Sequence, residues 1–269
     1  YDFKKAFDVT DRAFIVHKLQ DNFGVSPYYC NYLYNFLSSR EFIIEIETFA
    51  GVIRSGSYKQ YTGVVQGSKL GPLLFLAHIN DLLVELDTVD CCNCFAFADD
   101  LSILITGETH AELQRRLRIV NKIVCDWADR NYQPLNEDKT KILHIHGVGN
   151  LTMEINSVQV EVAKKVKILG IVVDDKLNFA DQAEKVLNQV KTRTRGLFAL
   201  GSQKWGPSES TLRVVYQAMI ESCVRYGIAI WWSYAPKTVI AQIQTLLNVC
   251  VWRVLGVPYR TNLYISYDN

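Results

Sequence analysis

Three aspartates stand where they could act together on metal ions. Asp2 ends the short apolar stretch that opens the chain. Asp99 and Asp100 separate two apolar runs, Cys91 to Ala98 and Leu101 to Thr106, which predicts a tight hairpin with acidic residues at its tip. In an antiparallel sheet these carboxylates could meet at one edge, where divalent cations would relieve their repulsion. Two such ions about 4 Å apart can activate an attacking hydroxyl and stabilise a leaving phosphate oxygen.

An Asp-Asp pair alone is weak evidence, because most such pairs belong to turns or helix caps. The order of several segments along the chain is more specific: DFKKAFD at 2–8, GVVQGSKLGPLLFLAHINDL at 63–82, FADD at 97–100, LNEDKTK at 135–141 and ILGIVVDDKLNF at 168–179. In this order they resemble the successive palm motifs of reverse transcriptases from non-LTR (LINE-type) retrotransposons. The resemblance covers essentially the whole chain and is looser towards its C-terminal end.

The resemblance implies an RNA-directed DNA polymerase that uses two divalent ions, Mg²⁺ or alternatively Mn²⁺. Its partners would be an RNA template, a DNA primer and deoxynucleoside triphosphates. By the same resemblance Asp2 and Asp99 are metal ligands, Asp100 supports them, and the backbone carbonyl of Phe3 is a further ligand. Lys139 matches a lysine proposed to protonate the leaving pyrophosphate, although a solvated lysine at a strand start explains it nearly as well.

Three further residues match positions that meet the incoming nucleotide. Phe7 would occupy the space of a ribonucleotide 2′-hydroxyl and so favour deoxynucleotides, with an ordinary core phenylalanine as the less favoured alternative. Gln66 and Gly67 match the loop that contacts the nucleotide and the template. Glycine permits close backbone approach there, and the glutamine amide offers both a donor and an acceptor.

The C-terminal part of the chain matches regions that hold the nucleic acid. Leu169 and Gly170 match the hairpin that grips the primer end. Four basic residues would lie on a helix of the thumb: Lys185, Lys191, Arg193 and Arg195. Phosphate contacts from such a helix would be salt-sensitive and independent of base sequence. An ordinary solvated helix face is an equally good explanation of this charge pattern.

Hydrophobic periodicity and turn residues predict the elements that must position these side chains. Helices are expected at 14–23, 28–39, 73–86 and 110–131, with Pro72 in the first turn of the third. Strands are expected at 42–49, 58–65, 141–146 and 166–173, the first two paired, with a short hairpin turning at Asn156 and Ser157. The remainder of the chain reads as helical.

We therefore predict an α+β fold: a polymerase palm, with an antiparallel sheet packed by helices, followed by an all-helical, thumb-like lobe. The expected domains are the palm at 1–160, the primer-grip hairpin and junction at 161–178, and the thumb and C-terminal lobe at 179–269. With 269 residues and 49% hydrophobic content, the chain is long and apolar enough for a sizeable core.

The net charge of +1 by itself indicates no particular partner, but the charge is unevenly distributed. Residues 1–138 contain 13 basic and 19 acidic side chains, whereas residues 139–269 contain 16 and 9. The first part could hold cations and the second could hold phosphates. Seven cysteines, odd in number and mostly isolated, favour a reducing, intracellular compartment, which the resemblance narrows to the nucleus or cytoplasm of a eukaryotic host. Without a signal peptide or an apolar run of about 18 residues, we expect no membrane partner.

Two interpretations stay open at this stage. The leading one is a polymerase core, which the intact aspartates favour. The alternative is a catalytically silent remnant that keeps the palm fold and only binds nucleic acid. The abrupt start at Tyr1 leaves out the fingers region, so we expect the parent polyprotein to supply fingers and an endonuclease region, and this fragment alone to be inactive. A nucleotide cyclase or an RNA-copying polymerase is disfavoured by the Gln66-Gly67 and Leu169-Gly170 segments.

Overall fold

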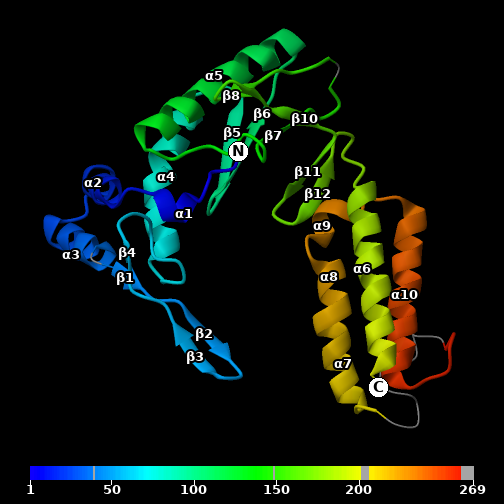
Figure 1. The fold of residues 1–269 in the computed structure, drawn as a ribbon. Coiled ribbons are helices and arrows are strands. Elements are labelled where there is room, and N and C mark those ends of the chain that lie inside the picture. The colour runs from blue at the N-terminus through cyan, green and yellow to red at the C-terminus, as the bar shows by residue number, and fades with distance from the viewer. Residues whose placement is uncertain (39, 148, 201–205, 262–269) are drawn as a thin grey trace. The chain divides into compact units, whose positions relative to one another are not determined.

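The computed structural model describes residues 1–38, 40–147, 149–200 and 206–261 (Figure 1). The chain forms two compact units, which we describe separately. The first contains Tyr1–Ile142 and Val148–Val162, and the second contains Leu143–Gly147 and Ala163–Asn269. All seven cysteines are free. The combination of helices with small sheets confirms the α+β class predicted from the sequence.

The helices of the first unit are α1 (Ala6–Val9), α2 (Arg12–Phe23), α3 (Pro27–Leu37), α4 (Gly71–Asp87) and α5 (His110–Arg130). The four long ones confirm the four helices predicted from periodicity; Ser39, included in one of those predictions, lies outside the described residues. Local signals explain their ends. The Asp11 carboxylate accepts the Ala13 N–H and begins α2, and Gly24 ends it in a left-handed conformation at φ 63°.

The core of the first unit lies where α4 and α5 pack with the β5–β6 hairpin, formed by β5 (Cys92–Phe97) and β6 (Asp100–Ile105). Each contributes one apolar face, because buried positions recur at helical spacing on α4 and α5, and less exposed positions alternate with exposed ones along β5. The largest fully buried side chains include Trp127, Phe75, Ile79, Leu82, Leu86 and Leu101.

The strands of the 40–60 region differ from the sequence prediction. Instead of two long paired strands, four short ones form two antiparallel pairs: β1 (Arg40–Phe42) with β4 (Tyr58–Gln60), and β2 (Glu45–Thr48) with β3 (Gly51–Arg54). The alternating apolar pattern predicted strands, but it did not reveal the reversal at 49–50. Both β2 and β3 are exposed along their whole length, and they form a ribbon that projects from the unit (Figure 1).

The remaining strands are short. β8 (Glu154–Ile155) and β9 (Val158–Gln159) form the hairpin predicted at Asn156 and Ser157, both of which have positive φ. β7 (Lys141–Leu143) pairs with β10 (Glu161–Ala163) and is shorter than the strand predicted at 141–146. The single strand predicted at 166–173 is wrong: the segment is a hairpin of β11 (Lys165–Ile168) and β12 (Ile171–Asp174). Its two central residues, Leu169 and Gly170, both have positive φ, as a type I′ turn requires.

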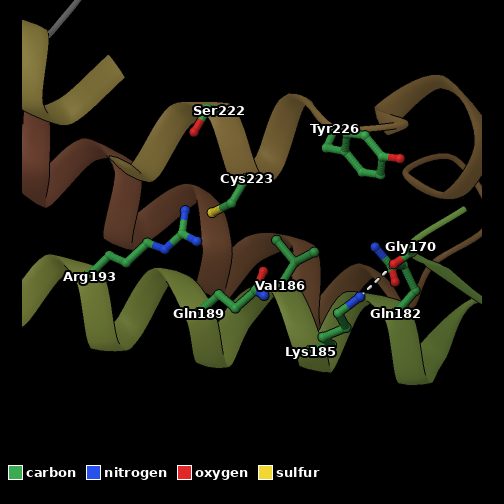
Figure 2. A pocket seen from close by; sticks show the side chains of 9 residues that line it. All are labelled: Gly170, Gln182, Lys185, Val186, Gln189, Arg193, Ser222, Cys223 and Tyr226. Atoms are coloured by element: carbon green, nitrogen blue, oxygen red, sulfur yellow. Dashed lines mark hydrogen bonds between the residues drawn. The ribbon is translucent and has the colours of Figure 1, made fainter. Parts of the chain in front are cut away.

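Most of the described residues after β12 are helical, as predicted. The helical elements of the second unit are α6 (Ala180–Ala199), α7 (Glu209–Tyr216), the π-helical turn η1 (Gln217–Glu221), α8 (Ser222–Arg225), α9 (Ile228–Trp231) and α10 (Lys237–Leu255). α10 packs against α6, and their buried side chains form the core of this unit together with Ile220 and Trp231. Between α6 and α8 lies a cleft of about 270 Å³ (Figure 2).

One helix departs from the expectation that the chain has no apolar segment long enough to cross a membrane. α10 is 19 residues long, and a window within it has a mean hydropathy of 1.3, so length and composition alone would allow it to cross a membrane. Core helices can pass the same test. The buried side chains of Ile243, Cys250 and Val254 belong to the core of the second unit, and 17% of the apolar window is buried.

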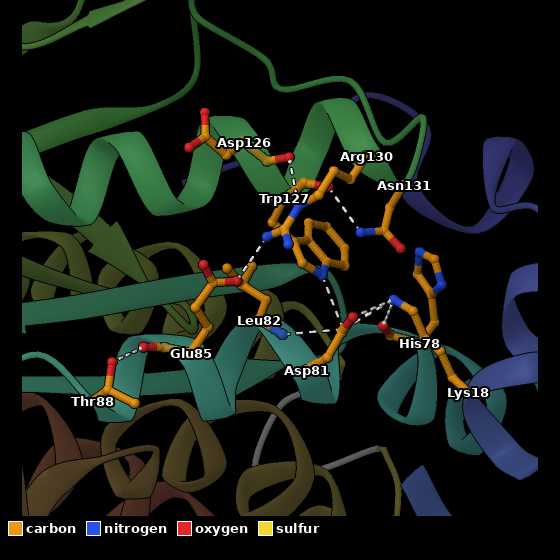
Figure 3. A network of polar contacts seen from close by, with 10 residues as sticks. All are labelled: Lys18, His78, Asp81, Leu82, Glu85, Thr88, Asp126, Trp127, Arg130 and Asn131. Atoms are coloured by element: carbon orange, nitrogen blue, oxygen red, sulfur yellow. Dashed lines mark hydrogen bonds and ion pairs between the residues drawn. The ribbon is translucent and has the colours of Figure 1, made fainter. Parts of the chain in front are cut away.

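A network of polar contacts joins α2, α4 and α5 beside the first core (Figure 3). The Asp81 carboxylate accepts hydrogen bonds from the Lys18 ammonium and the Trp127 indole N–H, both at 2.9 Å. Lys18 also donates to the His78 carbonyl at 2.7 Å, and its Nζ lies 5.0 Å from the Trp127 ring centroid. The Asn-Asp-Leu end of the 63–82 block therefore has a packing role: its aspartate fixes α4 to two other helices.

The His78 side chain is fully buried beside this network. Neither ring nitrogen has a hydrogen-bond partner within the described part of the chain. Burial, together with the nearby Lys18 ammonium, lowers the pKa of His78 to about 3. The imidazole is therefore neutral in the folded protein at physiological pH.

This burial predicts acid-sensitive stability. An unfolded chain protonates His78 near pH 6.5, whereas the folded chain resists protonation until about pH 3. The free energy of unfolding should therefore fall by up to roughly 1.4 kcal/mol for each pH unit below 6.5. Urea unfolding between pH 7.5 and 5 should show a flatter pH dependence in His78→Leu than in the wild type. The exposed His17 provides the control, since His17→Leu should keep the wild-type slope; equal slopes in all three proteins would contradict the prediction.

Candidate functional site

Asp2 and Asp100 lie opposite each other on two antiparallel segments. The Tyr1 amino group donates to the Leu101 carbonyl at 2.7 Å, and the Leu101 N–H donates back to the Tyr1 carbonyl at 3.4 Å. These reciprocal bonds make Tyr1 and Leu101 an opposed pair. Leu101 faces the core, so the preceding pair, Asp2 with Asp100, faces away from it. Side chains opposed in this way have Cβ atoms about 4.5–5.5 Å apart.

The other edge of Asp2 contacts the segment that follows α5. Phe3 forms an antiparallel bridge with Leu135, and the Asp2 N–H donates to the Thr140 hydroxyl at 3.2 Å. The Lys139 ammonium approaches the Asp2 carboxylate at 3.9 Å while its side chain stays 70% exposed. The structure thus brings Asp2, Asp100 and Lys139 together from three segments far apart in the sequence.

Asp99 occupies the tip of the hairpin between β5 and β6. The turn consists of Ala98 and Asp99, because Phe97 already pairs with Asp100 across the hairpin. The predicted turn, Asp99 with Asp100, is therefore displaced by one residue. Ala98 has φ 53°, a left-handed conformation that costs an alanine about 1 kcal/mol. The displacement puts Asp100 on the strand and leaves Asp99 alone at the tip.

The arrangement suits a hard divalent cation in part. Opposed carboxylates such as Asp2 and Asp100 repel each other, and oxygen donors of this kind are the ligands that Mg²⁺ and Mn²⁺ prefer. Within residues 1–38, 40–147, 149–200 and 206–261, however, no three His, Cys, Asp or Glu side chains gather as a ready-made metal-binding group. The expected gathering of Asp2, Asp99 and Asp100 is thus not preformed. The metal-ligand roles of these residues and of the Phe3 carbonyl stay predictions.

Phe7 and Gln66 lie side by side at a second part of the site. The half-buried Phe7 ring contacts the Phe75 ring, with centroids 4.6 Å apart, so it is anchored on the core. The Phe7 carbonyl accepts the Val64 N–H at 2.7 Å. Next to it, the Gln66 amide donates to the Asp8 carboxylate at 2.8 Å. The two predicted nucleotide-contacting segments therefore touch through both backbone and side chains.

Two glycines allow the loop at 63–67 to take this course. At Gly63, with φ 84°, a Cβ atom would lie 2.5 Å from the Asp8 carbonyl oxygen, so any side chain would clash. Gly67 has φ 79° but open space around it, so its requirement is conformational. The loop packs against the end of α1 at Gly63, and it turns away from α1 at Gly67.

The guanidinium of Arg12 fixes the same loop from inside. It donates to the carbonyls of Gln60, Thr62 and Gly63, each at 2.9 Å. Arg12 is only 6% exposed, and this burial lowers the pKa of its guanidinium from the ordinary value. Three carbonyl oxygens of the loop are thereby paired, and the segment leading to Gln66 has a fixed starting point.

The predicted primer-grip turn is held by two side chains of the second unit. The Tyr226 hydroxyl donates to the Leu169 carbonyl at 2.5 Å, and the Lys185 ammonium donates to the Gly170 carbonyl at 2.6 Å. Gly170 has φ 87°, and a Cβ atom there would meet the Tyr226 ring at 3.4 Å. The turn is therefore tied to α6 and to the residue after α8.

Lys185 and Arg193 line the cleft between α6 and α8 (Figure 2). Its lining contains these two cations but no carboxylate: Gly170, Gln182, Lys185, Val186, Gln189, Arg193, Ser222, Cys223 and Tyr226. Arg193 also donates to the Met219 carbonyl. Of the four basic residues predicted to contact nucleic acid, these two make internal hydrogen bonds, whereas Lys191 and Arg195 are exposed on α6.

Some residues of the site were not singled out by the sequence. Arg12 lies outside the motif segments, and Asp8 formed part of a motif without a role of its own. Tyr226 lies far from any recognised segment. The signal for Asp8 was its place at the end of the DFKKAFD segment at 2–8.

The chain resembles known proteins along most of its length. Residues 1–173 match the family model described as reverse transcriptase (RNA-dependent DNA polymerase). The probable RNA-directed DNA polymerase from transposon BS of Drosophila melanogaster is 26% identical over 96% of this chain, which spans 29% of that protein. The Pol polyprotein from the type-1 retrotransposable element R1 of Nasonia vitripennis is 26% identical over 72% of this chain and 60% of that protein. The RNA-directed DNA polymerase from mobile element jockey of Drosophila melanogaster is 22% identical over 96% of this chain and 28% of that protein. The chain thus spans less than two thirds of each of these relatives.

The Arg12 contacts predict a large effect of its removal on stability. Arg12→Met leaves three carbonyls without their donor, and each buried, unsatisfied polar group costs about 1–3 kcal/mol. Since part of this loop can regain water, we expect urea unfolding to show a loss of about 2–4 kcal/mol, with Arg12→Lys intermediate. The exposed Arg195 gives the matched control, and Arg195→Met should change stability by less than about 0.5 kcal/mol. A loss below about 1 kcal/mol in Arg12→Met would show that the three contacts are not structural.

Proposed function

The chain belongs to the reverse transcriptase (RNA-dependent DNA polymerase) family, and from this membership we propose that it is the polymerase core of a non-LTR retrotransposon protein. In this proposal the first unit corresponds to the palm, and the helical unit corresponds to the thumb. The reaction is the transfer of a deoxynucleotide to the 3′-hydroxyl of a DNA primer on an RNA template. The observation that carries the proposal is the apposition of Asp2 and Asp100, with Asp99 at the adjoining hairpin tip.

Divalent ions, when bound, would lower the barrier by stabilising charge on the attacking and leaving oxygens. The carboxylates of Asp2, Asp99 and Asp100 would hold them, because Asp2 and Asp100 are opposed on adjacent segments and Asp99 adjoins them at the hairpin tip. Lys139, which approaches Asp2 while remaining exposed, would supply a proton to the leaving pyrophosphate. Its distance of 3.9 Å from Asp2 keeps its ammonium beside the reacting centre.

Phe7, Gln66 and Gly67 would form the pocket for the incoming nucleotide. The Phe7 ring rests on Phe75 and cannot move inward, so it would block the space of a 2′-hydroxyl. The loop held by Arg12 would present Gln66 to the nucleotide. Because Gly67 carries no side chain, a template base could approach its backbone closely.

The second unit would hold the nucleic acid by its phosphates. A cleft lined by Lys185 and Arg193, with no carboxylate, is suited to an anion, and the exposed Lys191 and Arg195 lie on the same helix. The turn at Leu169 and Gly170 borders this cleft through Lys185. The net positive charge of residues 139–269 supports the same assignment.

Primer extension tests the metal-ligand assignment. We would measure dNTP incorporation on an RNA template with Mg²⁺ or Mn²⁺, using this chain and a longer polypeptide that includes any residues encoded upstream of it. Asp99→Ala should lower the extension rate roughly a hundredfold or more, because it removes a ligand of ions that contribute several kcal/mol. Asp90→Ala, which removes an exposed carboxylate just before β5, should leave the rate within about twofold.

An active Asp99→Ala protein would remove the metal assignment. If neither form of the wild-type protein extended a primer but both bound primer-template, the silent nucleic-acid-binding alternative would replace the polymerase proposal.

Sugar discrimination tests the role of Phe7. Phe7→Ala opens space beside the nucleotide sugar, so the preference for dNTP over rNTP in single-nucleotide incorporation should fall by about tenfold or more. Phe75→Leu loosens the same ring contact without opening that space, and its preference should stay near that of the wild type. Unchanged discrimination in Phe7→Ala would return Phe7 to a purely structural role in the core.

A further inference from the structure

We propose that Asp8 is a positioning residue that fixes which end of the Gln66 amide faces the nucleotide. In this orientation the Gln66 side-chain oxygen points to the ligand, so the group it recognises is a hydrogen-bond donor on the nucleotide: a sugar hydroxyl or a base amino group. The inference rests on the proposed function for its ligand, but the orientation of the amide follows from the protein alone.

The backbone on both sides of the contact is held in place. The Asp8 carbonyl accepts the Thr62 hydroxyl at 3.0 Å, and the Thr10 carbonyl accepts the Gly63 N–H at 2.8 Å. Arg12 holds the carbonyls of the same loop, as described above. With the start of the loop and the end of α1 fixed together, the Asp8 and Gln66 side chains meet at 2.8 Å in an open part of the site.

The chemistry of the two groups decides the orientation. An ionised carboxylate can only accept hydrogen bonds, whereas an amide has a donor end and an acceptor end. Gln66 must therefore turn its NH₂ group towards Asp8. Its side-chain oxygen then faces away from Asp8 with both lone pairs available, and one N–H remains. Without Asp8 the amide could turn over and offer two donors instead.

This arrangement gives the site a selectivity that Gln66 alone would lack. An acceptor held at a fixed place discriminates a nucleotide that carries a donor from one that lacks it, because an unpaired polar group is costly in a bound complex. Phe7, adjacent to Asp8 in the chain, limits the same site by volume. Shape and hydrogen-bond polarity would thus be set by two consecutive residues.

A reciprocal exchange of the two groups tests the proposal in primer extension with the longer polypeptide. Asp8→Asn should raise the KM for dNTP roughly three- to tenfold, the equivalent of one hydrogen bond, with little change in kcat. Gln66→Glu should be impaired at neutral pH and recover as the pH falls, because a protonated carboxyl can donate to Asp8 as the amide did. The double variant Asp8→Asn with Gln66→Glu should regain a low KM, since an amide at position 8 can donate to the new carboxylate, which keeps an acceptor facing the ligand.

A structural role for Asp8 would not produce this recovery. A double variant as impaired as the single ones, or an unchanged KM in Asp8→Asn, would overturn the proposal. Asp11→Asn is the matched control: it makes the same change of charge three residues away, at the cap of α2, and should leave KM unchanged. Two comparisons separate the two possible donors. If a 3′-hydroxyl is the donor, the Asp8→Asn effect should disappear for dideoxynucleotides. If a base amino group is the donor, the effect should differ among the four bases.

The orientation itself can be measured without any reaction. In NMR spectra of the 269-residue chain, the side-chain NH₂ signals of Gln66 should shift as Asp8 titrates, and the shift should be absent in Asp8→Asn. No shift in the wild type would overturn the orientation even if the enzyme is active. A clear shift in a protein that never extends a primer would instead leave the orientation standing and remove the polymerase proposal.

Discussion

The backbone pairing of residues 1–4 holds the first unit's site together. This short segment bonds to Leu101 on one side and to Leu135 and Thr140 on the other, so it joins the hairpin to the segment after α5. Each of these partners lies about a hundred or more residues away in sequence. Without the pairing, Asp2 would have no fixed relation to Asp100, and Lys139 would have none to either. The acidic and basic groups of the site therefore depend on contacts between main chains, with the side chains placed by alternation.

The sequence predicted the helices well, because apolar residues recur at helical spacing in α2 and α5, and Pro72 marks the first turn of α4. It predicted strands less well. The segment at 166–173 is apolar apart from Lys167 and Gly170, and its hydrophobic pattern does not indicate the reversal at Leu169 and Gly170, although the family resemblance placed a hairpin there. The hairpin at Asp99 was predicted with its turn one residue too late in the chain, since an alanine in a left-handed conformation has no clear sequence signal.

The candidate site was predicted in its motif residues but not in its supporting ones. Phe7 and Gln66 were identified by resemblance, and the structure brings them together. Asp8 and Arg12 were not identified, because a hydrogen bond to a loop 50 residues away depends on the folded path of the chain. Lys185 was expected to face nucleic acid, and its ammonium instead bonds to the Gly170 carbonyl. Such internal partners depend on tertiary geometry, which charge patterning cannot reveal.

The contacts of Arg12 have a consequence for how this region can change over generations. All three of its acceptors are main-chain carbonyls, so the contacts do not depend on which side chains stand at positions 60 and 62. Position 60 can therefore drift without disturbing the anchor, whereas Thr62 also contributes its hydroxyl, which donates to the Asp8 carbonyl at 3.0 Å. Position 63 cannot drift, because any side chain there would collide with the Asp8 carbonyl. Mutational tolerance in this loop should therefore be uneven, with a permissive position 60, a position 62 that favours a hydroxyl and a forbidden position 63, so a lineage could vary part of the loop surface while retaining its path.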